Sequence, residues 1–291
     1  MRTVRQNVLM RACFVMCATS AVAETTLDPD HRDAYGANIG WINAAGDVEG
    51  GAVVGQAFCS GSLYSGNCGW IHLGDGSPAD GRAYANSTAA DYGVNHDGLG
   101  NLSGCAYGAN IGWIAFEQTH GKPKVDLSTG ILSGSVYGAN VGWIALNTAQ
   151  GCVRTLTLDA GPDDDADGIP DAWELRHSRS LAVFADGGAD WDCDGAADAA
   201  EYRADTDPAN PTDRLRITAF EVAGTTNRVS WPARPTRQYA LQRAPALSNG
   251  TVWAEGPSSI PASESEMTET VPDAADTVRF YRVRADLPLA Q

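Results

Sequence analysis

The chain has 291 residues, with 36 acidic and 20 basic side chains and a formal net charge of −16 at pH 7. A length of this order accommodates two or three small domains. So large a negative charge repels phosphate groups, which argues against nucleic acids and anionic membranes as partners.

Residues 1–23 have the pattern of a secretory signal peptide. The stretch Arg2–Arg11 carries three arginines, a short apolar run follows over residues 12–16, and Ala21-Val22-Ala23 supplies a small-x-small cleavage site. The apolar run is far too short to span a bilayer, and no later segment of the sequence reaches that length. We therefore predict a secreted, extracellular protein without a transmembrane anchor.

Residues 24–152 contain an internal repeat rich in glycine and aromatic residues. Its octapeptide, Tyr-Gly-Ala-Asn-Ile-Gly-Trp-Ile in the first copy, occurs four times with small changes: at Tyr35–Ile42, Tyr64–Ile71, Tyr107–Ile114 and Tyr137–Ile144. The spacing gives a unit of about thirty residues, with one insertion near residues 74–95. Short β-prone runs alternate with glycine and asparagine turns, so we predict a β-hairpin array that is solenoid-like, propeller-like or a sandwich.

These repeats resemble the Gly-x-Asn-Ile-Gly-Trp-Ile repeats of secreted and surface proteins of bacteria. Each unit carries one tryptophan, and the four are Trp41, Trp70, Trp113 and Trp143. They form either a core ladder, in which each unit packs on the next, or an exposed platform for sugar rings. A tryptophan flanked by glycine and a β-branched residue more often packs than binds, so the sequence favours the core. The asparagine of each unit is expected to form a turn or to bond to the backbone of another unit.

Five cysteines follow the predicted signal peptide: Cys59, Cys68, Cys105, Cys152 and Cys193. In an oxidising compartment such residues usually form disulfides, and an odd number leaves one over. The sequence predicts local pairing of Cys59 with Cys68 and pairing of Cys105 with Cys152. Cys193 then remains free or forms an intermolecular bond.

Residues 153–213 hold two acidic segments, 163–174 and 190–201, that match the twelve-residue calcium-loop template. In both, acids stand at positions 1, 3, 5, 9 and 12, and a glycine stands at position 6, where the loop turns sharply. Calcium takes roughly six to eight oxygen ligands, which explains acids at every second position. A solvated acidic linker is the alternative, but it does not explain why the glycine and the glutamate recur at the same offsets. We predict two bound calcium ions.

The paired loops resemble those of the dockerin and EF-hand class and of thrombospondin type 3 repeats. Gly161-Pro162 and Gly187-Gly188 stand where a full EF-hand has its first helix, so the closer resemblance is to dockerin-like loop–helix units. The resemblance implies side-chain ligands, or backbone carbonyl ligands at position 7, from Asp163, Asp165, Asp167, Ile169, Asp171, Glu174, Asp190, Asp192, Asp194, Ala196, Asp198 and Glu201.

Residues 214–291 alternate strongly between apolar and polar side chains, as in Leu215–Phe220 and Val278–Val283. Some six or seven short runs of this kind are separated by Pro, Gly and Ser turns, which predicts a small β-sandwich. The pattern looks like that of a fibronectin type III module.

The sequence therefore predicts a mainly β protein with a repeat array, a calcium-loop cassette that contains short helices, and a C-terminal sandwich. No catalytic motif is present, and the clustered acids are assigned to calcium. The favoured function is a non-enzymatic surface or matrix protein in which calcium rigidifies the link between two β modules, with an unknown protein or polysaccharide as partner. The alternatives are a carbohydrate-binding accessory module that uses the repeat tryptophans and, after it, an unrecognised extracellular hydrolase.

Overall fold

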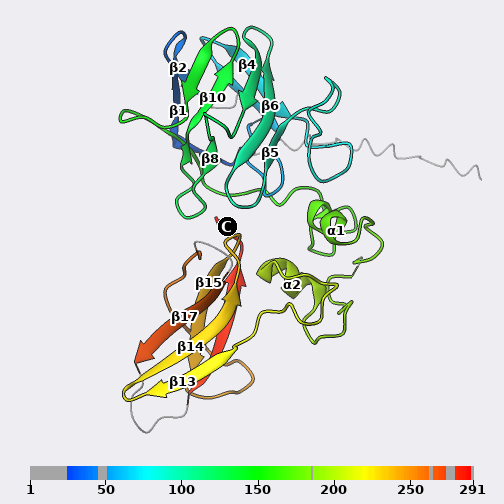
Figure 1. Ribbon diagram of the computed structural model, residues 1–291, viewed down its shortest axis with the longest axis vertical. Coiled ribbons are helices and arrows are strands. Elements are labelled where there is room, and N and C mark those ends of the chain that lie inside the picture. Colours follow the sequence, from blue (N-terminus) through cyan, green and yellow to red (C-terminus); the bar gives the residue numbers. More distant parts are fainter. Residues whose placement is uncertain (1–24, 45–50, 185, 262–264, 273–278, 290–291) are drawn as a thin grey trace, which may run out of the picture.

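The computed structural model describes residues 25–44, 51–184, 186–261, 265–272 and 279–289. The predicted signal peptide lies outside these residues. As predicted, the described chain is mainly β, with two short helices. Figure 1 shows an N-terminal barrel at one end, two C-terminal sheets at the other, and the helices beside the junction between them.

The four repeats form four antiparallel hairpins of the N-terminal module. These are β1 (Leu27–Gly36) with β2 (Gly40–Asn43), β3 (Gly61–Ser65) with β4 (Gly69–Gly74), β6 (Leu102–Gly108) with β7 (Gly112–Phe116), and β10 (Ser135–Gly138) with β11 (Gly142–Ala145). Four shorter strands complete the module: β5 (Val94–His96), β8 (Lys124–Val125), β9 (Leu132–Ser133) and β12 (Val153–Thr155). Because β12 pairs with β1, the sheet of this module extends beyond residue 152.

The hairpins close into a barrel instead of extending as a solenoid or stacking as a sandwich. The strand order is β12-β1-β11-β10-β7-β6-β4-β3, so the first and last repeats are neighbours, with Tyr35 opposite Ala145. The remaining gap lies between β2 and β3. There Asn67 donates to the carbonyls of Ile39 and Trp41, at 3.0 and 2.9 Å, and ties the two edges together. The solenoid and sandwich predictions for these repeats are therefore wrong.

The repeat asparagines link each hairpin turn to a neighbouring turn around one end of the barrel. Each side-chain amide donates to a backbone carbonyl of another unit: Asn38 to Val141, Asn67 to Ile39, Asn110 to Cys68 and Asn140 to Ile111, at 3.0–3.2 Å. This confirms the predicted bonding across units. It also requires glycine at Gly142, whose φ is +77° and whose added Cβ would lie 3.0 Å from the Asn38 amide nitrogen.

The isoleucine and the tryptophan of each repeat are adjacent and so face opposite sides of the wall. The isoleucines point inward and are 3–4% exposed: Ile42, Ile71, Ile114 and Ile144. The tryptophans point outward and are 43–45% exposed: Trp41, Trp70, Trp113 and Trp143. The predicted tryptophan core ladder is therefore wrong. An eight-stranded barrel is just wide enough for aliphatic side chains, and four additional indole rings do not fit inside it.

All five cysteines among the described residues are unpaired, so both predicted disulfides are wrong. Cys59 precedes β3 and Cys68 lies in the turn that follows it, which separates them by roughly 17 Å at about 3.3 Å per strand residue. A disulfide requires Cα atoms within about 7 Å. Cys105 lies in β6, and four strands of the sheet separate it from the strand that follows Cys152.

The C-terminal module is a sandwich of two three-stranded sheets, as predicted. One has the order β13-β14-β17 and the other β16-β15-β18; the strands are β13 (Ala219–Ala223), β14 (Thr226–Ala233), β15 (Gln238–Ala244), β16 (Ala254–Glu255), β17 (Ser265–Pro272) and β18 (Phe280–Asp286). Trp231 of one sheet and Tyr239 of the other share a buried core. Ala204, from the helical segment, belongs to the same core, so this segment packs directly on the sandwich.

Candidate metal centre

The first acidic loop curls around its own carboxylates. Asp163, at position 1, accepts the N–H groups of Asp167 and Gly168 at 3.3 and 3.1 Å. Asp171, at position 9, accepts the N–H of Asp164 at 2.9 Å. These bonds fold positions 1 to 9 into a compact turn whose acids converge.

The second loop repeats this pattern position by position. Asp190 accepts the N–H groups of Asp194 and Gly195 at 3.0 and 2.9 Å, and Asp198 accepts the N–H of Trp191 at 3.0 Å. The same pairs of positions, 1 with 5 and 6 and 9 with 2, are bonded in both loops. Two segments with different side chains at non-acidic positions thus adopt one backbone structure.

The backbone dihedrals agree with this equivalence. Position 6 is left-handed in both loops, with φ of +93° at Gly168 and +97° at Gly195. Position 4 is left-handed as well, with φ of +59° at Ala166 and +61° at Cys193, although neither residue is glycine. The chain therefore accepts some strain at position 4 in order to turn the acids inward.

The acids at positions 1, 3 and 5 form a triplet in each loop. One carboxylate oxygen from each member lies within 4.8 Å of the others, and the triplets are Asp163, Asp165 and Asp167, and Asp190, Asp192 and Asp194. Two triplets of hard oxygen donors at this spacing can hold a metal ion.

The helices begin at position 9 of each loop, which confirms the predicted loop–helix order. They are α1 (Asp171–His177) and α2 (Asp198–Ala204), and the first turn of each carries the position-12 glutamate. Glu174 is 0% exposed and Glu201 is 1% exposed. Neither carboxylate oxygen of Glu174 has a hydrogen-bond partner, and Glu201 has one only at the oxygen that accepts from Thr206.

A buried carboxylate without a partner is costly, so its protonation becomes easier. Burial, together with the negative charges of the neighbouring loop acids, raises the pKa of Glu174 to about 7. The same causes raise the pKa of Glu201 to about 8. A cation beside these oxygens would offset both effects, so the donors present fit a hard divalent ion.

The position-7 residues of the two loops make equivalent backbone hydrogen bonds. Ile169 and Ala196, at position 7, donate their N–H groups to Asp167 and Asp194, each at 2.8 Å. The Ile169 side chain is fully buried and packs with aromatic residues of α1 and α2. The four tryptophans, by contrast, lie on separate hairpins of the barrel wall and belong to no loop.

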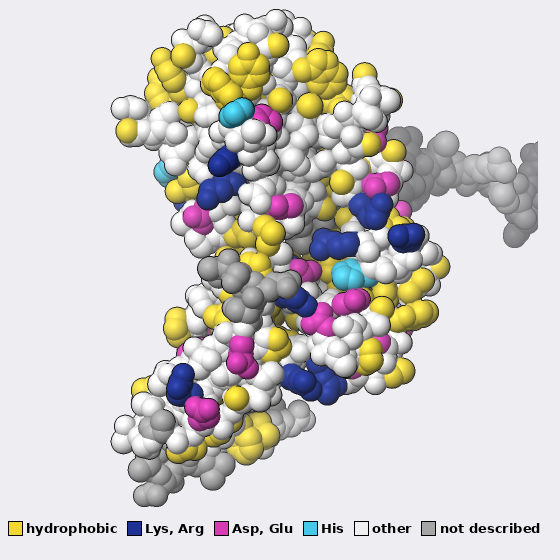
Figure 2. Space-filling model, in the orientation of Figure 1, with side chains coloured by type: hydrophobic (Ala, Val, Ile, Leu, Met, Phe, Trp, Pro, Cys, Tyr) yellow, Lys and Arg dark blue, Asp and Glu magenta, His cyan; other side chains and the backbone are white. Residues whose placement is uncertain are grey.

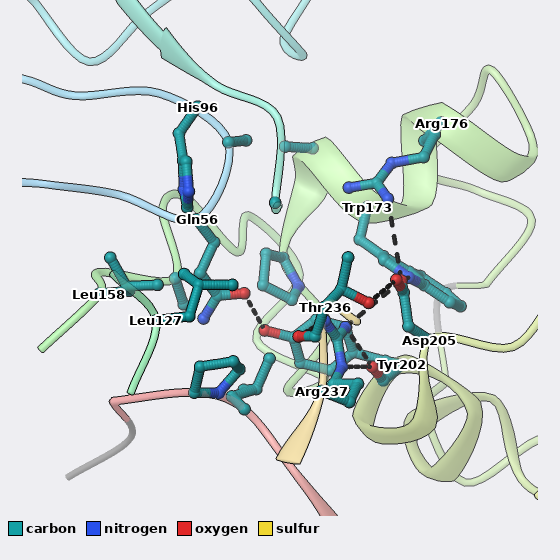
Figure 3. Close-up of a pocket in the computed structure, with 17 residues that line it drawn as sticks. Gln56, His96, Leu127, Leu158, Trp173, Arg176, Tyr202, Asp205, Thr236 and Arg237 are labelled. Atoms are coloured by element: carbon teal, nitrogen blue, oxygen red, sulfur yellow. Dashed lines mark hydrogen bonds and ion pairs between the residues drawn. The ribbon is translucent and has the colours of Figure 1, made fainter. Parts of the chain in front are cut away.

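The helical segment contacts the barrel through both helices. Ala172 of α1 packs in a buried cluster with Phe58 and Tyr84. Tyr202 of α2 donates its hydroxyl to the Gln56 side chain at 2.9 Å. Figure 3 shows this bond at the junction, where the lining residues come from the barrel, the helices and the C-terminal module. The residues that contact the barrel thus lie at the end of the first loop and directly after the second.

Asp205, which ends α2, connects the helices to the sandwich. Its carboxylate accepts a hydrogen bond from Trp173 of α1 at 3.3 Å, another from Thr236, and lies 3.4 Å from the Arg237 guanidinium. Figure 3 shows these side chains converging. Burial disfavours the charge of Asp205, but Arg237 and Thr236 outweigh it and hold its pKa below the ordinary value.

Sequence reasoning missed Tyr202, Asp205 and Arg237. Arg237 lies in the turn between β14 and β15 and is 6% exposed, although arginine is among the residues most often found at the surface. Asp205 and Arg237 are 32 residues apart, and no spacing or motif links them. A tertiary contact of this kind leaves no local signal.

Neither described helix, at seven residues each, has the length or the apolar character needed to cross a membrane. Comparison of the chain with known proteins gives no match to a family model, to a curated protein or to a solved structure.

Proposed function

We propose that this chain is a secreted, non-enzymatic surface or matrix protein in which two calcium ions stiffen the link between two β modules. The observation that supports this most strongly is the position of α1 and α2. Each helix begins inside an acidic loop with two of its acids, and the same helices carry the side chains that contact the barrel and the sandwich.

The clustered carboxylates repel one another within each loop. Three aspartates have carboxylate oxygens within 4.8 Å of one another, and a buried glutamate follows them, so an opposing positive charge between these groups would offset the repulsion. Bound calcium supplies that charge and accepts the carboxylate oxygens as ligands. We infer that the twelve predicted ligands hold the two ions, and that the order of both helices, and with it the contacts of Tyr202 and Asp205, depends on them.

The extracellular setting agrees with this function. Extracellular calcium modules bind with dissociation constants of about 10⁻⁴ to 10⁻³ M, so they remain loaded outside cells. The resemblances to dockerin-like loops, to bacterial surface repeats and to a fibronectin type III module point the same way. We propose that a protein or polysaccharide of a cell surface or matrix is the partner, and that the stiffened link fixes the spacing of the modules that display it.

The test combines calcium titration calorimetry with small-angle scattering of the purified chain, in calcium and in EDTA. We expect two bound ions and a smaller, less variable radius of gyration when calcium is present. The double variant Asp163→Asn with Asp190→Asn keeps both turns capped but removes the position-1 charges, so its scattering is expected to stay EDTA-like in calcium.

Asp126→Asn is the matched control. Asp126 also accepts backbone N–H groups, those of Ser128 and Thr129, but it lies in the barrel module. This variant is expected to respond to calcium as the natural chain does. Binding of two ions without any change in scattering would show that calcium has no part in the link. Absence of binding would show that the loops are acidic spacers.

A further inference from the structure

The outer wall of the barrel carries four copies of one aromatic pair. Each hairpin places a tyrosine directly opposite a tryptophan, with ring centroids 4.9–5.2 Å apart: Tyr35–Trp41, Tyr64–Trp70, Tyr107–Trp113 and Tyr137–Trp143. These rings are 38–45% exposed. Figure 2 shows hydrophobic side chains gathered on the visible face of the barrel end. Large exposed apolar side chains repeated on one wall mark an interaction surface.

Strands of neighbouring hairpins pair at three contacts, and one of the three differs from the other two. Where hairpins meet, the residue opposite the tyrosine is alanine in two places: Ala115 opposite Tyr137 and Ala145 opposite Tyr35. Where β4 meets β6, the residue opposite Tyr107 is His72. A polar, hydrogen-bonding side chain therefore replaces a methyl group at this one contact, which we call the β4–β6 seam.

The insertion near residues 74–95 adds a third ring at the β4–β6 seam. Tyr92 lies 4.8 Å from Trp113, with the two ring planes at 88°, and 6.4 Å from Tyr107. Its hydroxyl lies 3.1 Å from Nδ1 of His72. Trp113 is nevertheless 45% exposed, as much as the other tryptophans. The seam thus gains a ring and a polar pair while the tryptophan stays accessible.

This combination fits a sugar ring. A pyranose presents C–H groups on its faces and hydroxyl groups around its edge. An exposed indole face packs against the C–H groups, and a neighbouring hydroxyl and imidazole exchange hydrogen bonds with the sugar hydroxyls. Trp113 provides the indole face, and Tyr92 and His72 provide the hydroxyl and the imidazole.

The four repeated aromatic pairs and the net charge of the chain limit the chemical class of the ligand further. Four similar aromatic pairs around the barrel can each bind a similar unit of a repeating polymer. A folded protein partner, by contrast, would present different side chains to each pair. The net charge of −16 disfavours an anionic polymer. We propose that the β4–β6 seam binds a neutral polysaccharide, with Trp113 stacked on one sugar ring and the other pairs making weaker contacts with further units.

The test is titration calorimetry with cellohexaose, xylohexaose, mannohexaose and chitohexaose, using the full chain in calcium and again in EDTA. We expect at least one hexasaccharide to bind, equally in both buffers, because the site is built from barrel residues alone. Failure of this proposal is therefore separable from failure of the calcium link. Trp113→Ala is expected to weaken binding about tenfold or more.

The chain supplies its own matched controls. Trp143→Ala removes an equivalent ring from a pair without a third ring, and it is expected to leave hexasaccharide affinity within about twofold. Tyr92→Phe keeps the ring but removes the hydroxyl. His72→Ala introduces the alanine that stands opposite the tyrosine at the other two paired contacts. Both are expected to weaken binding about threefold to tenfold. All four positions are at least partly exposed, so unchanged circular dichroism is expected throughout.

Three results would overturn the proposal. The first is no binding of any hexasaccharide by the natural chain. The second is an equal loss in Trp113→Ala and Trp143→Ala, which would show that the seam is not special. The third is binding of a decaproline peptide in place of the sugars, since aromatic ridges also recognise polyproline helices.

Discussion

Glu174 and Glu201 are both buried residues of the fold and predicted ligands of the calcium sites. Each lies in the first turn of a short helix, is almost completely buried, and has carboxylate oxygen without a hydrogen-bond partner. Two carboxylates in such surroundings bind protons at neutral pH unless a cation is present. The stability of the chain should therefore fall with rising pH in the absence of calcium and lose this dependence when calcium is bound.

In EDTA, we expect the midpoint of thermal unfolding to fall as the pH rises from 6.5 to 8. The folded pKa values of about 7 and about 8 lie above the unfolded value near 4.5, so the folded chain holds more protons in this interval. Burial lowers the pKa values of His96 and His177, so these residues act oppositely, but their effect fades as the pH rises above the unfolded value near 6.5. Saturating calcium displaces the protons and should abolish the fall. A midpoint in EDTA that rises over this interval would contradict the assignment.

Replacing either glutamate should separate stability from binding. In EDTA, Glu174→Gln and Glu201→Gln remove a buried negative charge, so their unfolding midpoints are expected to rise. In calcium, each variant loses a ligand, and its affinity by calorimetry is expected to fall about tenfold or more. Glu221→Gln, at an exposed glutamate of the sandwich, should change neither quantity. Unaltered calcium affinity in both test variants would exclude position 12 from the sites.

At the scale of elements, the asparagine ties are what connect one hairpin to the next at the turn end of the barrel. Asn140 lies between two hairpins whose strands also pair, since β7 and β10 are hydrogen-bonded. Asn67 lies at the gap between β2 and β3, where its two bonds link the edges and the described residues form no strand pairing. The two asparagines occupy equivalent positions, but Asn67 contributes more than Asn140 to holding its neighbouring hairpins together.

Asn67→Ala should consequently destabilise the edges β2 and β3, whereas Asn140→Ala should have no such local effect. Each lost hydrogen bond is worth about 0.5–1.5 kcal/mol of unfolding free energy, so in urea unfolding Asn140→Ala should lose roughly 1 kcal/mol and Asn67→Ala, which loses two bonds, roughly 2 kcal/mol. Amide hydrogen exchange should distinguish them, with faster exchange in β2 and β3 expected for Asn67→Ala alone. Equal exchange in the two variants would show that the gap is held by other contacts.

The sequence predicted the hairpins, their number and the loop–helix units, because each depends on local chemistry. Glycine and asparagine mark the turns, and acids at fixed offsets mark the loops. It did not predict that the array closes, because the pairing of Tyr35 with Ala145 joins repeats about 110 residues apart. It also placed the tryptophans inside. Alternation shows that Trp41 and Ile42 face opposite sides, but only the width of the closed barrel decides which one is buried.

For the whole molecule, the pair of Asp205 and Arg237 joins the helices to the sandwich. Arg237 also donates to the carbonyls of Tyr202 and Arg203, at 2.7 and 3.0 Å, so its guanidinium closes the end of α2. Burial lowers the pKa of Arg237, and Asp205 opposes that shift. Asp205 makes the buried charge of Arg237 tolerable in this position, and Asp205 itself lies near both Arg237 and Arg176, at 3.4 and 3.8 Å.

Asp205→Ala should therefore be among the most destabilising substitutions in the chain. It leaves Arg237 buried without a counter-ion, which costs about 3–5 kcal/mol of unfolding free energy. Glu221→Ala breaks an exposed pair with Arg228 and should cost about 0–1 kcal/mol. Urea unfolding followed by tryptophan fluorescence compares the two. Similar losses would mean that the junction contributes little to stability.

The pairing of the first hairpin with the last has a consequence for how such a protein changes over generations. A linear array can lengthen by duplicating one unit, since each new unit finds the same neighbours. In this ring, a fifth hairpin would have to enter either between two hairpins that already pair or at the gap between β2 and β3, and in each place it would break the asparagine-to-carbonyl bond found there. Adding a unit therefore disturbs contacts that already exist, whereas a single unit can diverge without doing so, as the long segment bearing Tyr92 shows.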